Sequence, residues 1–254
     1  MPMLDIGHAH LHYERIAGDP TRPLLVFLHE GLGCVAMWKD FPQRLCQATG
    51  CEGLLYDRLG YGQSSPMQEA RSVHYLHEAA LLELPTVLRH LAPGREHILV
   101  GHSDGGSIAL IYGAGRVPAL RGVVTAAAHV FVEEITLDGI RDALDAHGAG
   151  KLRGLERYHG DKAGPLVFAW ADTWLAPAFA HWNIEYLLPS IACPLLALQG
   201  SGDQYGSPAQ LDAIEAGAQR AVQLLVPGCG HNPHLEQPDA VLKAMTSFIS
   251  RAAG

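Results

Sequence analysis

The stretch Gly101-His102-Ser103-Asp104-Gly105-Gly106 decides how the rest of the chain is interpreted, because it places a serine between two glycines. The residues before it, 97–100, form a short apolar run that is typical of a buried strand. The residues after it, 107–114, carry apolar side chains at helical spacing. Ser103 therefore lies at a predicted strand-to-helix turn, the context in which a G-x-S-x-G pattern marks a nucleophile.

Short apolar runs bounded by glycine, proline and aspartate recur along the chain, and segments with helical spacing separate most of them. The runs are 24–28, 53–56, 98–100, 122–127, 195–198 and 222–226. This alternation predicts an α/β fold, a mostly parallel twisted sheet flanked by helices. Segment 4–16 alternates in polarity and is expected to form an antiparallel pair at one edge. Segment 72–91 is expected to be a long helix, in which Pro85 starts a new turn or causes a kink.

The alternation stops between residues 129 and 190, which contain no convincing strand. A structureless loop of about sixty residues is rare in a compact domain. Segments 134–144 and 168–186 show helical patterns instead. We therefore expect an α/β core built from 1–128 and 191–254, with a helical cap inserted at 129–190.

The composition of the 254-residue chain is that of an ordinary globular protein, with 48% hydrophobic and 17% charged residues. A net charge of -8, without a run of lysine or arginine, argues against nucleic acid or an anionic membrane surface as the main partner. No apolar stretch is long enough to span a bilayer, and the first residues lack the layout of a signal peptide. Five cysteines without C-x-x-C pairs favour free thiols in a reducing, cytoplasmic compartment. The oligomeric state stays open, a homodimer included.

Three side chains in the order serine, aspartate, histidine each follow a predicted strand. The hydroxyl of Ser103 needs a base within hydrogen-bond reach, and that base needs an acid to orient it. His231, after the last strand, is favoured as the base over His234, which lies closer to the next helix. Asp203 is favoured as the acid, although by itself it would be read as an ordinary turn residue. Because the carboxyl ends of parallel strands meet at one edge of a sheet, we expect these side chains to lie together.

The loop after strand 24–28, His29-Glu30-Gly31-Leu32-Gly33, is a candidate oxyanion loop. A tetrahedral intermediate needs backbone N–H donors at its oxyanion, and Gly31 and Asp104 are the candidates. The carboxylate of Asp104 is expected in the first turn of the following helix, where the positive end of the helix dipole favours it. Glu30 is expected to form a local hydrogen bond within its loop rather than to act as a catalytic acid.

Together these motifs resemble the α/β-hydrolase superfamily over nearly the whole chain. The resemblance is carried by residues 29–33, 57–64 (Asp-Arg-Leu-Gly-Tyr-Gly-Gln-Ser), 101–106, 200–203 and 230–238. It implies a nucleophile, an acid and a base at Ser103, Asp203 and His231, and oxyanion donors at Gly31 and Asp104. Glu30 departs from the family pattern, because many members have a second glycine there. The turn that carries Ser103 is called the elbow below. A serine at the elbow, rather than an aspartate, argues against the haloalkane dehalogenase and epoxide hydrolase branches.

The side chains around this predicted site suggest a pocket for a small molecule with an apolar wall. The candidate substrate contacts are Glu30, Leu32, His129, Trp170, Trp174 and Trp182. Aromatic residues at helical spacing more often pack a cap onto a core, but some of these should roof the cleft. His129 is expected at the same sheet edge, either as a substrate partner or as a structural histidine. Asp57 and Arg58 are expected to pin the loop beside the oxyanion segment.

The leading hypothesis is hydrolysis of a carboxylic ester, lactone or thioester through an acyl-enzyme on Ser103. A second enzyme hypothesis is hydrolysis of a carbon–carbon bond in a dienoic ketone, and cofactor-free peroxidation is a weaker third. A hypothesis of a different class is that the chain is a ligand-binding receptor of the same fold with little turnover. No glycine loop of the nucleotide-binding form and no metal-ligating cluster is found, so neither a cofactor nor a metal is expected. The sequence does not identify the substrate, because specificity depends on the shape of the pocket.

Overall fold

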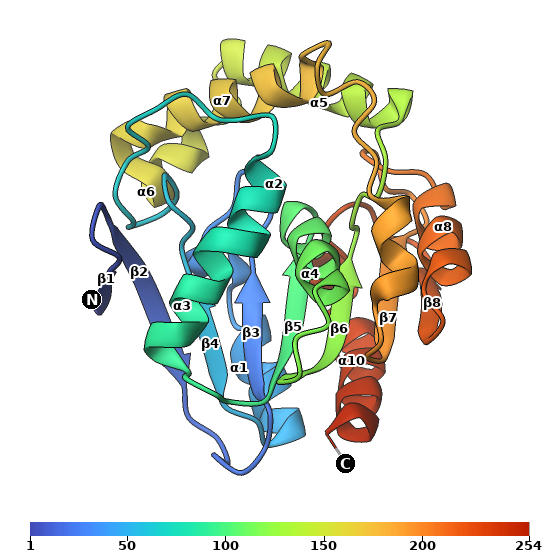
Figure 1. Cartoon of the computed structure of the whole chain (residues 1–254). Helices are drawn as coiled ribbons and strands as arrows, with labels where there is room; N and C mark the ends of the chain where they lie inside the picture. The colour runs from blue at the N-terminus through green and yellow to red at the C-terminus, as the bar shows by residue number, and fades with distance from the viewer. Residues whose placement is uncertain (254) are drawn as a thin grey trace.

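A computed structural model, which describes residues 1–253, contains an eight-stranded sheet with helices on both faces (Figure 1). The strands are β1 (Met3–Asp5), β2 (His10–Ile16), β3 (Leu24–Leu28), β4 (Gly53–Tyr56), β5 (His97–His102), β6 (Leu120–Ala126), β7 (Leu195–Gly200) and β8 (Ala221–Val226). They lie in the order β1-β2-β4-β3-β5-β6-β7-β8. Strands β3 to β8 are parallel, and β1 and β2 form an antiparallel pair at one edge. The predicted α/β fold and its antiparallel edge are confirmed.

The helices connect and cover these strands. The α-helices are α1 (Phe41–Thr49), α2 (Tyr75–Glu78), α3 (Leu84–Leu91), α4 (Asp104–Ala114), α5 (Glu134–Gly148), α6 (Glu156–His159), α7 (Ala163–Leu175), α8 (Ala209–Gly217), α9 (Pro233–Glu236) and α10 (Pro238–Ala252). Short 3-10 helices are η1 (Val35–Trp38), η3 (Arg153–Leu155), η4 (Gly160–Lys162) and η5 (Glu185–Ser190), and η2 (Ala79–Glu83) is a π-helical segment.

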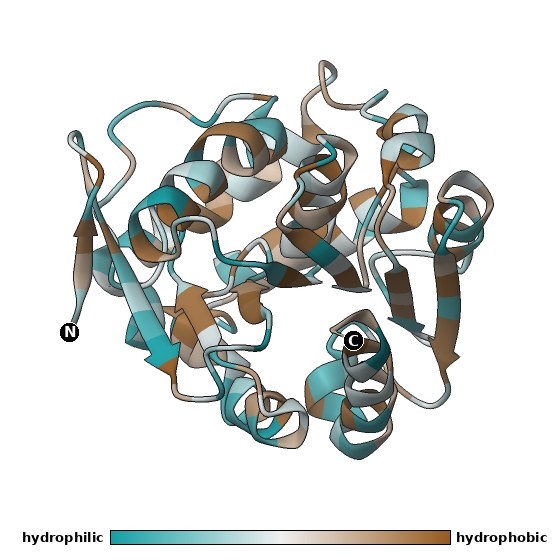
Figure 2. Cartoon of the chain, turned by 60° about the horizontal axis from the view of Figure 1, so that its bottom comes forward, coloured by the Kyte–Doolittle hydropathy of each residue, from teal (hydrophilic) through white to brown (hydrophobic). Residues whose placement is uncertain are grey.

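The hydrophobic core is divided by the sheet into two layers, because successive side chains of a strand point to opposite faces. Along β3, Val26 packs in one layer with the inner sides of α3, α4 and α8. Its neighbour Phe27 packs in the other layer with α1 and α10. All five residues of β3 are buried, as expected for a parallel strand covered on both faces. Figure 2 shows the hydrophobic strands lying between these two groups of helices.

The helix predicted over 72–91 begins at Tyr75 and is divided into α2, the π-helical η2 and α3. Pro85 lies in the first turn of α3, so the expectation that it starts a new turn is confirmed. Proline has no N–H to donate to the carbonyl four residues earlier, which explains why the regular α-helical pattern is interrupted just before it.

Helices α5, α6 and α7 all belong to the segment between β6 and β7, and Figure 1 shows them above the carboxyl ends of the strands. The expectation of a helix over 168–186 is wrong in its second half, since α7 ends at Leu175. Ala176 is extended there and precedes Pro177, and the residue before a proline is disfavoured in the helical conformation. Within residues 1–253 no helix is both long and apolar enough to cross a membrane. The division into core and cap stays a prediction.

Candidate active site

Ser103 occupies a strained turn between β5 and α4. Its φ of 51° and ψ of -116° lie where side-chain-bearing residues are rare, a conformation that costs on the order of 1–3 kcal/mol. The turn also brings α4 close to β3: a Cβ added to Gly105 would lie 1.9 Å from the backbone oxygen of Leu28. Only glycine fits there. The hydroxyl of Ser103 is thereby held at the carboxyl end of the central strand.

The structure brings Ser103, His231 and Asp203 into one chain of hydrogen bonds. The Oγ atom of Ser103 lies 2.9 Å from Nε2 of His231, and Nδ1 of His231 lies 2.8 Å from Oδ1 of Asp203. Because a carboxylate only accepts, the network assigns the ring hydrogen to Nδ1 and leaves Nε2 free to accept from the hydroxyl. These residues follow β5, β7 and β8, which end at the same edge of the sheet.

Asp203 is held as a carboxylate. Burial raises its pKa, but the hydrogen bond and charge of His231 outweigh burial, so that the pKa lies below its ordinary value. The backbone N–H of Tyr205 donates a further hydrogen bond to Oδ1 at 2.9 Å. With these contacts the carboxylate fixes the orientation of the imidazole ring.

Gly31 and Asp104 lie side by side at the end of β3 and the start of α4. A Cβ added to Gly31 would lie 2.5 Å from Nε1 of Trp170 and 3.3 Å from Oδ2 of Asp104. Within residues 1–253 the backbone N–H groups of Gly31 and Asp104 have no recorded intramolecular acceptor. Arg58 steadies the loop, since its Nη2 donates to the backbone oxygen of Glu30 at 2.8 Å. Both N–H groups are therefore available to an external acceptor.

The carboxylate of Asp104 belongs to a network that ties the segment above the sheet to the elbow. Nε1 of Trp174 donates to the hydroxyl of Tyr75 at 2.8 Å, and that hydroxyl donates to Oδ2 of Asp104 at 2.9 Å. Nη2 of Arg58 lies 3.7 Å from the same oxygen. Since an indole N–H can only donate, the direction of this chain is fixed from Trp174 to Asp104.

Glu30 reaches farther than the local contact expected from the sequence. Its Oε2 lies 3.4 Å from Nδ1 of His102, the residue before the elbow serine. Nε2 of His102 donates to the backbone oxygen of His231 at 2.8 Å. Burial raises the pKa of Glu30, but the hydrogen bond and charge of His102 outweigh it and hold the pKa well below its usual range. The carboxylate thus contacts a histidine of β5.

His129 lies beside the imidazole of His231, with ring centroids 6.0 Å apart. Its Nε2 donates to the backbone oxygen of Tyr205 at 2.8 Å, while its Nδ1 is buried without a hydrogen-bond partner within the described chain. Burial and the neighbouring His231 lower the pKa of His129, so that Nδ1 is an acceptor. His129 thus has a structural contact on one nitrogen and an unused acceptor on the other.

The remaining candidate residues make different contacts around the site. Trp174 is edge-on to His129, with centroids 5.3 Å apart, whereas Trp182 stacks on Phe179. Leu32 is half-buried and packs against the core. His234, the rival base, packs against Trp38, and burial and His102 lower its pKa to about 3. It makes no recorded contact with Ser103.

Sequence reasoning did not find Tyr75 or the contact between Glu30 and His102. Tyr75 is separated from Asp104 by 29 residues, and Glu30 from His102 by 72. No spacing pattern signals either pair. The one signal in the sequence for the second contact is that Glu30 and His102, both titratable, directly precede Gly31 and Ser103. Within residues 1–253 no group of three or more His, Cys, Asp or Glu side chains could hold a metal ion.

Comparison with known proteins finds the same fold in solved structures and identifies the family of the chain. The model of the alpha/beta hydrolase family matches residues 25–244. The chain belongs to this family. The family match by itself specifies neither a reaction nor a substrate.

Individual relatives are distant or partial. The proline iminopeptidase of Lactobacillus helveticus (strain DPC 4571) is 37% identical over 101 residues, which are 39% of this chain and 34% of that protein. The match thus spans about a third of that relative's length. The 2-succinyl-6-hydroxy-2,4-cyclohexadiene-1-carboxylate synthase of Salmonella paratyphi C (strain RKS4594) is 28% identical over 94% of this chain and 98% of its own.

Among solved structures, the enol-lactonase from Burkholderia xenovorans LB400 superposes with a TM-score of 0.75. It is 19% identical, and the match covers 98% of this chain and 100% of that one. At that identity the likeness concerns the fold alone.

Proposed function

We propose that this hydrolase is a serine hydrolase that cleaves a carboxylic ester, lactone or thioester of a small apolar or aromatic substrate. The observation that carries the proposal is the chain of hydrogen bonds from Ser103 through His231 to Asp203. This arrangement supplies a hydroxyl, a base that accepts its proton and an acid that orients the base.

In the proposed reaction, Oγ of Ser103 attacks the carbonyl carbon while Nε2 of His231 takes the hydroxyl proton. Asp203 stabilises the imidazolium that forms. The backbone N–H groups of Gly31 and Asp104 donate to the oxyanion of the tetrahedral intermediate. The intermediate then collapses, the carbonyl–heteroatom bond breaks, and the leaving group takes the proton from His231. Water, deprotonated by the same base, hydrolyses the acyl-enzyme.

We propose that the segment 129–190 acts as a cap over this site. The contact between Trp170 and Gly31 supports this, because it places an indole ring from α7 next to a proposed oxyanion donor. Trp174 adds a second aromatic ring beside His129. An aromatic roof of this kind favours an apolar or aromatic acyl group.

A substrate panel tests the proposal against carbon–carbon hydrolysis and against a receptor with little turnover. Aryl esters, lactones, thioesters and dienoic ketones are offered to the wild type and to Ser103→Ala, and a serine-directed phosphonate is used as a label. We expect many turnovers of p-nitrophenyl esters by the wild type, a loss of at least a thousandfold in the variant, and labelling that requires Ser103. Substantial esterase activity in Ser103→Ala, or selective bleaching of the dienoic ketone, would contradict the ester assignment.

We further propose a cytoplasmic, reducing location. All five cysteines are free thiols, a state that such a compartment maintains. Fractionation of the source cells, with detection of this chain, tests the location directly.

A further inference from the structure

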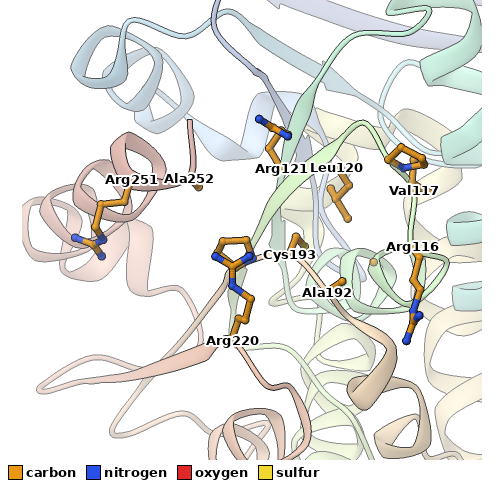
Figure 3. A pocket seen from close by; sticks show the side chains of 12 residues that line it. Arg116, Val117, Leu120, Arg121, Ala192, Cys193, Arg220, Arg251 and Ala252 are labelled. Atoms are coloured by element: carbon orange, nitrogen blue, oxygen red, sulfur yellow. The ribbon is translucent and has the colours of Figure 1, made fainter. Parts of the chain in front are cut away.

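A cavity of about 440 Å³ at the opposite edge of the sheet from Ser103 is lined by four arginines (Figure 3). Arg116 lies in the connection from α4 to β6, Arg121 in β6, Arg220 just before β8 and Arg251 in α10. The cavity is therefore at the amino ends of the strands whose carboxyl ends surround the elbow. It belongs to no part of the proposed active site.

Small and apolar side chains and one thiol form the floor between the arginines. The other lining residues are Gly113, Val117, Pro118, Leu120, Ala192, Cys193, Pro194 and Ala252. None of them is acidic. Figure 3 shows Arg251 and Arg116 toward the two ends of the cavity, with Arg220 and Cys193 between them. The surface thus combines an apolar floor with positive charge spread along its rim.

These guanidinium groups are poorly neutralised by the protein itself. Nε of Arg121 lies 3.3 Å from a carboxylate oxygen of Glu96. Within residues 1–253 no ion pair is recorded for Arg116, Arg220 or Arg251. Arg116 and Arg251 donate to neutral oxygens only. In a chain of net charge -8 with 18 lysines and arginines, four arginines around one cavity repel one another, and a bound anion relieves that repulsion.

We propose that this cavity binds a small organic phosphate that carries at least two negative charges. Guanidinium groups donate pairs of hydrogen bonds whose geometry matches phosphate oxygens. Because the arginines are spread along the rim, one phosphate group does not contact all of them, which favours a diphosphate or a bisphosphate. The volume falls within the range of small-ligand sites, and the apolar floor contacts the organic part.

Titration calorimetry with inorganic pyrophosphate at low ionic strength tests the anionic part of the site. We expect binding by the full chain, about tenfold weaker in Arg220→Ala, and intermediate in Arg220→Lys, which keeps the charge but loses the paired donors. The matched control is Arg89→Ala, because Arg89 is an exposed arginine of α3 that does not line the cavity. This variant should bind pyrophosphate as the wild type does. Absence of pyrophosphate binding, or equal binding by Arg220→Ala and the wild type, overturns the proposal.

Cys193 gives a second readout that reports on this cavity rather than on net charge. It is half-buried, whereas the other four cysteines are buried, and burial raises its pKa to about 11. Pyrophosphate should slow the alkylation of Cys193 by a neutral maleimide several-fold in the wild type and have little effect in Arg116→Ala/Arg220→Ala. Equal protection by malonate, a dicarboxylate, would overturn the assignment to phosphate, and protection that persists in the double variant would overturn the site.

Discussion

The ring of His102 is hydrogen-bonded on both sides by groups that cannot donate: the carboxylate of Glu30 faces Nδ1 and the backbone oxygen of His231 faces Nε2. Both ring nitrogens therefore carry hydrogen, and His102 is an imidazolium. Burial opposes the charge, but the contacts with Glu30 outweigh it and raise the pKa of His102. Asp203, His231 and His234 also face this ring. The half-buried Glu30 and the buried His102 thus form an ion pair, and the second hydrogen bond of His102 connects this pair to the loop of His231.

Replacement of Glu30 by glutamine should remove a pH-dependent part of the stability. The contribution of protonated His102 to the free energy of unfolding is fully present below pH 6.5, its ordinary pKa. It is lost as the pH rises through the raised pKa of His102 in the folded state. Ionised Glu30 contributes fully above pH 4.5, and this is lost as the pH falls through its lowered folded-state pKa. Urea unfolding should therefore show the largest gap between wild type and Glu30→Gln from pH 4.5 to 6.5, on the order of 1–3 kcal/mol.

Glu134→Gln is the control for this pH series, because Glu134 forms an exposed ion pair with Arg141, and such pairs contribute little. It should track the wild type at every pH. A gap for Glu30→Gln that does not narrow as the pH rises would contradict the imidazolium assignment.

The proposed acid is tested by a pair of isosteric variants. Asp203→Asn removes the carboxylate that fixes the tautomer of His231, and we expect kcat to fall by about 10³–10⁴. Asp104→Asn keeps an oxygen for Tyr75 and leaves the backbone N–H in place, so we expect a much smaller loss. Steady-state kinetics with one aryl ester decides between them. The opposite order of effects would make Asp104 the acid.

Gly31→Ala should separate crowding from the loss of an oxyanion donor. The new methyl group would collide with Nε1 of Trp170, displacing the loop, and removal of one such donor costs about 10²–10³ in kcat. In Gly31→Ala/Trp170→Ala the space is restored, so part of the activity should return. If the double variant is no better than Gly31→Ala, crowding by Trp170 is not the cause.

Tyr75→Phe should destabilise the protein by about 1–3 kcal/mol, because it leaves the Trp174 N–H and one side of the Asp104 carboxylate without their partner. Thermal unfolding measures the loss. Tyr186→Phe is the matched control, since this tyrosine is 69% exposed and should unfold at the wild-type temperature. An unchanged Tyr75→Phe would mean that water replaces the hydroxyl.

Ser103→Gly should be more stable than Ser103→Ala, although both lack the hydroxyl. The backbone of residue 103 has a positive φ, which glycine adopts without the steric cost that alanine retains. We expect a difference of about 1 kcal/mol in the free energy of unfolding. Equal stability of the two variants would show that the elbow relaxes when the serine is replaced.

Strands β3 to β7 could be predicted because nearly all their residues are buried on both faces, which explains their apolar runs. The predicted bounds of β3 and β4 agree with the structure to the residue. The serine, aspartate and histidine could be placed at one edge because each follows a predicted parallel strand. The contact between Glu30 and His102 and the hydrogen bonds from Trp174 to Asp104 could not be predicted, because they depend on how loops pack in three dimensions. The end of α7 was also missed, although Pro177 is a local signal for it.

The order of the elements along the chain determines when the proposed catalytic residues can first come together during synthesis. Ser103 precedes His231 by 128 residues, and translation at about 5–20 residues per second separates the two by on the order of ten seconds. During that interval the proposed nucleophile lacks its proposed base, and β7 and β8 are synthesised only toward the end of it. In the proposed mechanism, formation of the acyl-enzyme therefore requires that β7 and β8, which precede Asp203 and His231, have joined the sheet.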